Sequence, residues 1–238
     1  MNYNERISDY IASLSDENSA FCESLREYAE NNAVPVIKRC TELFLKNLLC
    51  IKRPANILEI GTAIGYSAIM MAETLKNAGI IQSNTLSKAC RSIGREHITT
   101  IEKYEKYLLL ARKNIDESGF ADSIKLICAD AGEALLQLRL QKKKYDFIFM
   151  DGAKAQYINW LPAVMDLLNT GGIIFADNVL QEGNIIESRF AVTRRDRCIH
   201  SRMREYLYAI THDKRLKSSI LEVHCMAEAN KAFSHFRF

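Results

Sequence analysis

From Ala55 onward the chain alternates short apolar runs with longer amphipathic segments, and few folds are compatible with that alternation. Short continuous apolar runs are typical of strands buried on both faces of a parallel sheet, and amphipathic segments between them fit helical crossovers. The predicted strands are 56–60, 98–102, 124–129, 145–150 and 172–176. The predicted helices are 66–76, 104–117, 131–140 and 157–168. The pattern predicts an α/β fold with a doubly wound, mostly parallel sheet of the Rossmann-like kind.

Composition agrees with a single folded domain over residues 1–238. Of the 238 residues, 48% are hydrophobic and 26% charged, which excludes an intrinsically disordered chain. Apolar spacing before Pro54 predicts two or three helices in 1–54, with Asp16 as a helix cap. We expect the sheet core in 55–178 and a basic, substrate-facing segment with a divergent tail in 179–238.

Polar residues follow each predicted strand where it ends. Glu59 with Gly61, then Glu102 and Asp130, end the first three strands, and the last two end in further acidic residues. Ligands of doubly wound sheets bind at the carboxyl ends of the strands. We therefore expect one edge of the sheet to carry a site lined with carboxylates.

The first of these ends is a glycine turn, at residues 57–67. Gly61 and Gly65 form G-x-x-x-G, which differs from the G-x-G-x-x-G of dinucleotide enzymes and suits a cofactor without a diphosphate. Glu102 is placed to accept hydrogen bonds from two ribose hydroxyls, and Asp130 to contact an adenine amino group. Each residue alone is better explained by an ordinary turn. Their order on successive strands, however, indicates a nucleotide-like cofactor.

Asp151, Asp177 and Asn178 end two strands that we expect to be neighbours. Two carboxylates and an amide carbonyl are hard oxygen ligands, which suit Mg²⁺, Mn²⁺ or Ca²⁺ and not zinc. Mg²⁺ is the expected cation, and its remaining coordination positions would be open to water and to two adjacent substrate oxygens.

Together these segments resemble a known family. LEIGTAIGYS, TTIEK, CADA, FMDGAK and ADNVL are similar to motifs of class I S-adenosylmethionine-dependent methyltransferases, specifically the cation-dependent O-methyltransferases related to catechol O-methyltransferase. The resemblance implies S-adenosylmethionine as cofactor and Asp151, Asp177 and Asn178 as cation ligands. The cofactor-binding residues that it implies are Glu59, Gly61, Gly65, Tyr66, Ser67, Glu102, Asp130, Ala131 and Asp151.

Lys154 follows Asp151 by three residues, as the general-base lysine does in that family. The catalytic residues expected on this basis are Lys154 and Asp151. An unperturbed lysine has a pKa of about 10.4, so this role requires a nearby cation and partial burial to lower it. The alternative is a solvated surface lysine.

Positive charge is concentrated after the predicted cation ligands. Residues 185–217 hold nine Lys or Arg against four Asp or Glu, although the whole chain carries only +3. The arginines are Arg189, Arg194, Arg195, Arg197, Arg202 and Arg204. Guanidinium groups bind phosphates bidentately, whereas a solvated helix face is the alternative for such a run.

The stretch from DNVLQEGN to HSRMREYLY resembles the bacterial tRNA 5-hydroxyuridine methyltransferases, which implies tRNA as partner and 5-methoxyuridine as product. The 5-hydroxyl beside the C4 carbonyl offers a cation two adjacent oxygens, as a catechol does. Tyr157 and Trp160 are candidates to stack near the base or to lie in the core. Two alternatives stay open: a small-molecule catechol or phenol O-methyltransferase, and a non-catalytic cofactor- or RNA-binding module.

Two segments depart from the family pattern. Residues 81–96 form an insertion before Glu102, and Ala227 to Phe233 has helical propensity where the family has a final strand. His224 and Cys225 are given no role.

The seven cysteines have no zinc-like spacing and are expected to be reduced. Without a signal peptide or membrane span in the sequence, we expect a cytoplasmic protein, and a homodimer.

Overall fold

The structure is a computed structural model that describes residues 10, 13–14, 18–81 and 96–221. Its strands are β1 (Ile57–Ile60), β2 (Ile98–Glu102), β3 (Ile124–Cys128), β4 (Tyr145–Met150) and β5 (Leu168–Ala176). Its α-helices are α2 (Ala20–Asn31), α3 (Arg39–Lys52), α4 (Tyr66–Asn77), α5 (Glu105–Glu117), α6 (Ala131–Leu140), α7 (Tyr157–Leu167) and α8 (Arg197–His212). Two 3₁₀ helices, η2 (Lys154–Gln156) and η3 (Gln181–Ile186), precede α7 and α8.

The strands form one parallel sheet in the order β3-β2-β1-β4-β5. This confirms the predicted doubly wound fold, and β2 and β4 have the predicted bounds. The largest difference is in β5, which begins at Leu168 and not at Gly172, because α7 ends at Leu167. Leu168 pairs with Tyr145 across an irregularity in the β4–β5 register.

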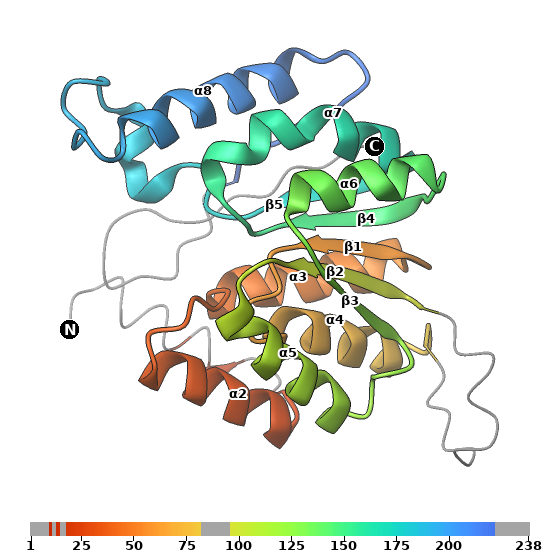
Figure 1. Ribbon diagram of the computed structural model, residues 1–238. Helices are drawn as coiled ribbons and strands as arrows, with labels where there is room; N and C mark the ends of the chain where they lie inside the picture. Colours follow the sequence, from red (N-terminus) through yellow and green to blue (C-terminus); the bar gives the residue numbers. More distant parts are fainter. Residues whose placement is uncertain (1–9, 11–12, 15–17, 82–95, 222–238) are drawn as a thin grey trace.

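Helices cover both faces of the sheet (Figure 1): α6, α7 and α8 lie on one face, and α2 to α5 on the other. Successive side chains of a strand point to opposite faces. Accordingly, Leu58 and Ile60 of β1 pack with the first group of helices, whereas Ile57 packs with the second. Both faces are therefore closed by apolar side chains, and polar groups gather where the strands end.

The helix before the sheet starts differently from the prediction. Ser19 caps α2, and its side chain accepts a hydrogen bond from the Cys22 amide. Asp16, the predicted cap, lies outside the described residues, as do most of the 81–96 insertion and the tail from 222, with His224 and Cys225.

Four of the described cysteines are free: Cys22, Cys50, Cys128 and Cys198. Cys40 is disulfide-bonded, so the expectation that every cysteine is reduced is wrong for Cys40. Among the helices of the described ranges, none combines the length and the apolar composition needed to cross a membrane.

Candidate active site

Three adjacent strands end side by side at the carboxyl edge of the sheet. From β1 the chain adds β2 and β3 on one side of the sheet, and from β4 it adds β5 on the other. Doubly wound sheets open a crevice for ligands where the direction changes in this way, here between β1 and β4. The Asp151 amide donates to Ile60 O at 2.9 Å, and the Asp177 amide donates to Met150 O at 3.0 Å. Gly61, Asp151 and Asp177 are therefore neighbours along this edge, as predicted for the ends of β4 and β5.

A cavity of about 600 Å³ opens at this edge. Most of the predicted cofactor-binding residues line it, together with Lys154. Those that do are Gly61, Tyr66, Ser67, Glu102, Asp130, Ala131 and Asp151. Glu59 and Gly65 do not line the cavity; Glu59 is fully buried beneath the turn, and Gly65 caps the amino end of α4.

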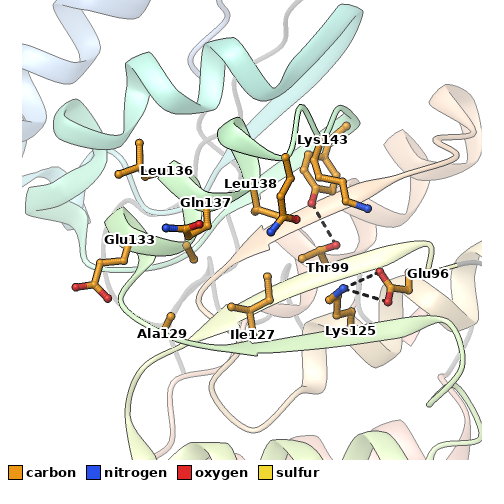
Figure 2. Close-up of a pocket in the computed structure, with 13 residues that line it drawn as sticks. Glu96, Thr99, Lys125, Ile127, Ala129, Glu133, Leu136, Gln137, Leu138 and Lys143 are labelled. Carbon is orange, nitrogen blue, oxygen red and sulfur yellow. Dashed lines mark hydrogen bonds and ion pairs between the residues drawn. The ribbon is translucent and has the colours of Figure 1, made fainter.

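A second cavity, of about 520 Å³, lies between α6 and strands β2 and β3 (Figure 2). Polar groups on its wall pair with one another: Lys125 with Glu96 at 3.1 Å, and the Tyr145 hydroxyl with Thr99 at 3.3 Å. None of the predicted site residues line it. The cavity at the carboxyl edge is therefore the candidate active site.

Gly61 has a structural reason to be glycine. Its φ is +108°, and a Cβ there would collide with the carbonyl oxygen of Asp151. The turn after β1 therefore lies directly against the turn after β4. This contact brings the backbone of both turns to the wall of the cavity.

Glu102 and Asp130 are held in place by backbone amides. One oxygen of Glu102 accepts from the amides of Lys103 and Tyr104, both at 2.8 Å, and the other accepts from Ala63 at 2.9 Å. Asp130 caps α6 by accepting from the Gly132 amide at 2.9 Å, which leaves its other oxygen near Lys103. Both carboxylates are thus fixed at the cavity before any ligand binds.

Glu59 lies behind the glycine turn with no exposed surface. Burial raises its pKa to about 7, although the hydroxyls of Ser67 and Thr100 donate to its carboxylate and act to lower it. Ser67 is in the first turn of α4 and lines the cavity. Glu59 therefore supports the turn through Ser67 and is not itself exposed to a ligand.

Asp151, Asp177 and Asn178 form a donor set that fits a hard cation. The Asn178 side-chain oxygen is buried and has no hydrogen-bond partner. Burial and the nearby Asp151 carboxylate raise the pKa of Asp177 above its ordinary value, as expected when one carboxylate lies close to another. A cation bound by these oxygens would supply the partner that Asn178 lacks and relieve the repulsion. No group of three His, Cys, Asp or Glu side chains suited to a metal occurs among the described residues, so the amide is required for this site.

Lys154 donates to Asp151 at 2.7 Å and to the Tyr157 hydroxyl at 3.0 Å, and its side chain is 19% exposed. It is therefore not the solvated lysine of the alternative interpretation. Burial acts to lower its pKa, but Asp151, Tyr157 and Asp177 outweigh burial and raise it. The surrounding protein groups thus oppose the predicted lowering, which a bound cation would have to provide.

The predicted arginines fall into two groups. Arg189, Arg194 and Arg195 lie in the loop before α8; they are exposed, and their side chains form no hydrogen bond or ion pair in the part of the chain that is described. The others belong to α8 and contact protein groups: Arg202 donates to Asn159 at 3.1 Å, and Arg204 donates to Ile185 O at 3.3 Å. The predicted run is therefore a loop followed by a helix, and its free cations are in the loop.

Comparison with known proteins identifies the family. The family model described as O-methyltransferase matches residues 12–101 and 94–226, which is most of the chain. The chain belongs to this O-methyltransferase family.

Relatives of this O-methyltransferase include the catechol O-methyltransferase of Niastella koreensis, 30% identical over 145 residues, covering 60% of this chain and 58% of that one. Caffeoyl-CoA O-methyltransferase 5 of Nicotiana tabacum is 32% identical over 146 residues, covering 60% and 54%. The matches thus span somewhat over half the length of these relatives. The solved O-methyltransferase from Bacillus cereus in complex with SAH has the same fold, with a TM-score of 0.79, 23% identity, and coverage of 98% of this chain and 97% of that one.

Two residues that line the cavity of this O-methyltransferase, Val36 and Ile37, are not among the predicted site residues. Trp160, a candidate for stacking or for the core, also lines the cavity. Trp160, 8% exposed, packs against Gly152, whereas Tyr157 is fully buried, so the core alternative holds for Tyr157. The apolar pair Val36 and Ile37 follows Pro35 in the sequence, within the segment 1–54 for which only helices are predicted.

Proposed function

We propose that this protein transfers a methyl group from S-adenosylmethionine to a hydroxyl oxygen that has a second oxygen beside it. The observation that carries the proposal is the single cavity that joins Glu102 and Asp130 to Asp151 and Lys154. A cofactor's nucleoside and an acceptor's hydroxyl can therefore be bound a short distance apart, which is the main requirement of a direct displacement.

Different residues along the carboxyl edge bind different parts of the cofactor and the cation. Glu102, fixed by three amides, accepts hydrogen bonds from the ribose hydroxyls, and Asp130 with Ala131 binds the adenine. The turn from Gly61 to Ser67, with Gly65 and Tyr66, holds the methionine part, and Glu59 supports it. Asp151, Asp177 and Asn178 hold the divalent cation, expected to be Mg²⁺. When bound, the cofactor supplies a methyl on its sulfonium, and the cation lowers the pKa of the acceptor hydroxyl.

Lys154 is the group that receives the acceptor's proton. Its Nζ lies 2.7 Å from Asp151 and 3.0 Å from the Tyr157 hydroxyl, which itself donates to Met150 O at 2.7 Å. These contacts fix the amine beside the cation ligands. In the neutral form, Lys154 Nζ takes the hydroxyl proton while Asp151 keeps it oriented.

The acceptor that we propose is 5-hydroxyuridine in tRNA. The exposed and unpaired Arg189, Arg194 and Arg195 follow the cation ligands in the chain and supply positive charge that small phenols do not need. A wobble uridine in an anticodon loop is unstacked, so it can reach a cavity while arginines hold the flanking phosphates. The second candidate is a small catechol or phenol, which the names of the relatives favour.

Mass spectrometry of nucleosides tests the proposal directly. Purified protein, S-adenosylmethionine and Mg²⁺ should convert 5-hydroxyuridine to 5-methoxyuridine in tRNA from cells lacking the modification, and chelation should stop the reaction. Activity that survives chelation would rule out the cation site. Methylation of catechol with none of tRNA would favour the second candidate, and cofactor binding without any transfer would favour a binding module.

Charge reversal at Arg194 and Arg195 separates the two acceptors. The double variant Arg194→Glu with Arg195→Glu should lose tRNA methylation, because both cations are reversed on an exposed loop. Any turnover of a small catechol should be retained, since neither residue lines the cavity. Equal loss of both activities would indicate damage to the fold instead.

The homodimer and the cytoplasmic location stay predictions. Analytical sedimentation would test the homodimer.

A further inference from the structure

The loop between η3 and α8, residues 187–196, is folded against the protein. Val192, in the middle of the loop, is only 8% exposed. His200, 2% exposed, donates a hydrogen bond from its ring to Glu187 O at 3.1 Å. Thr193 donates to Asp196 at 2.6 Å, just before α8 begins. Side chains that point outward from this loop are therefore held in place by a fixed backbone.

Phe190 is one of those outward side chains. It is 83% exposed, although burying such a ring would stabilise the fold by about 1.5–3 kcal/mol. The Arg197 guanidinium lies 5.9 Å from the ring centroid. Ile186, 75% exposed, ends η3 nearby in the chain. An exposed aromatic ring on a fixed loop, supported by a guanidinium, provides an open π-face for a ligand.

The surroundings of Phe190 indicate what that ligand is. Arg189, Arg194 and Arg195 are exposed on the same loop and unpaired within the described ranges, so one loop carries both the ring and three free cations. A flat aromatic partner that also carries negative charge at regular intervals fits this combination. Single-stranded nucleic acid has both properties, because bases stack on aromatic rings while arginines hold the phosphates.

The loop is also in the right place. η3 and α8 pack against each other, and α8 packs against η2, which carries Lys154. In Figure 1 the start of α8 and the loop before it stand at the same side of the sheet as the start of α7, where β4 ends. A single-stranded nucleic acid bound to this loop would therefore lie at the edge of the sheet that holds the candidate active site.

We propose that Phe190 is a stacking platform for an unpaired nucleobase that neighbours the methylated nucleotide, with Arg189, Arg194 and Arg195 on the adjoining phosphates. This inference rests on the proposed RNA substrate and adds a base contact to it. Phosphate contacts alone would position the strand, and the ring selects a splayed-out base over a paired one.

Fluorescence of 2-aminopurine tests the stacking. A synthetic anticodon stem-loop carries the probe at one loop position at a time and is titrated with the full-length protein. Wild type should quench one position strongly. Phe190→Ala should abolish that quenching and weaken binding by about 5- to 150-fold. Phe190→Trp should restore both, because it keeps an aromatic face.

Salt dependence separates stacking from charge. Phe190→Ala should leave the slope of log Kd against log salt unchanged, whereas Arg194→Ala should reduce it by about one. Leu109→Ala is the matched control: Leu109 is an exposed apolar residue of α5, 73% exposed, and its loss should change neither binding nor quenching.

Each other outcome overturns the inference in a distinct way. Unchanged binding and quenching in Phe190→Ala, with tRNA still methylated, would refute the platform and leave the proposed function intact. If Phe190→Ala instead changes only the sedimentation of the protein, the ring belongs to a contact between copies of the chain. A wild type that binds S-adenosylmethionine but no stem-loop would refute both the RNA substrate and the platform.

Discussion

The hydroxyl of Tyr66 donates a 2.7 Å hydrogen bond to the carboxylate of Glu42, and this contact joins α3 to the first residue of α4. Neither side chain is exposed beyond 3%. Arg26 of α2 donates to both of them, to the Tyr66 oxygen at 3.1 Å and to Glu42 by a shorter bond. Because Tyr66 lines the cavity, the helices before the sheet support the glycine turn from behind.

Tyr66→Phe should destabilise the protein by about 1–3 kcal/mol, because Glu42 and Arg26 each lose a buried hydrogen-bond partner. Urea denaturation measures the change, and binding of S-adenosylmethionine should weaken with it. Tyr104→Phe is the control: Tyr104 also lines the cavity, but it is 55% exposed and its hydroxyl makes no hydrogen bond in the described residues. Equal stability of the two variants would contradict the role given to Tyr66.

This buried cluster shows what sequence patterns leave out. Glu42 stands in an amphipathic helix, where a carboxylate ordinarily faces solvent, and no local pattern places Arg26 and Tyr66 against it from two other helices. Pairings of this kind depend on how helices pack. The strands, in contrast, were predictable to within a few residues, because burial on both faces leaves a continuous apolar run.

Glu59 makes folding depend on pH. Its pKa is about 7 in the folded protein and about 4.5 in the unfolded chain, so the folded state binds the proton more tightly. This contribution is complete below pH 4.5 and is lost as pH rises through 7, by on the order of 3 kcal/mol. Glu59→Gln removes the titration, so the loss of stability across this range should be smaller in the variant.

Urea denaturation of wild type and Glu59→Gln at several pH values from 4.5 to 8 measures the difference. Other groups titrate in both proteins, so the comparison isolates Glu59. A stability difference between the two that stays constant over the whole range would mean that Glu59 is ionised throughout.

Gly61→Ala should be far more damaging than Gly79→Ala. Both glycines have positive φ, +108° and +67°, so alanine is strained at either. A Cβ at Gly79 meets nothing within 4 Å, whereas one at Gly61 collides with the Asp151 carbonyl. We expect Gly61→Ala to cost about 1–3 kcal/mol more in unfolding free energy and to abolish cofactor binding, measured by calorimetry. Similar costs would show that the two turns can move apart.

The residues at the strand ends were predictable for a different reason from the strands. Asp151 and Asp177 come directly after apolar runs, and parallel pairing of Met150 with Ala176 brings the two ends together without further information. The pKa of Lys154 was not predictable in the same way, because it depends on the distances to Asp151 and Tyr157, which the spacing of residues does not give.

Asp177→Asn tests the cation site without relying on turnover. Binding of Mn²⁺, followed by electron paramagnetic resonance, should weaken by at least about tenfold, since even residues behind a metal's ligands cost that much when changed. Without cation, the variant should be at least as stable as wild type, because burial and Asp151 disfavour the charged form of Asp177. The matched control is Asp166→Asn, which removes an exposed carboxylate paired with Arg139 and should leave Mn²⁺ affinity unchanged. Unaltered Mn²⁺ affinity in Asp177→Asn would place the cation elsewhere, and a lower stability without cation would mean that Asp177 has a structural partner of its own.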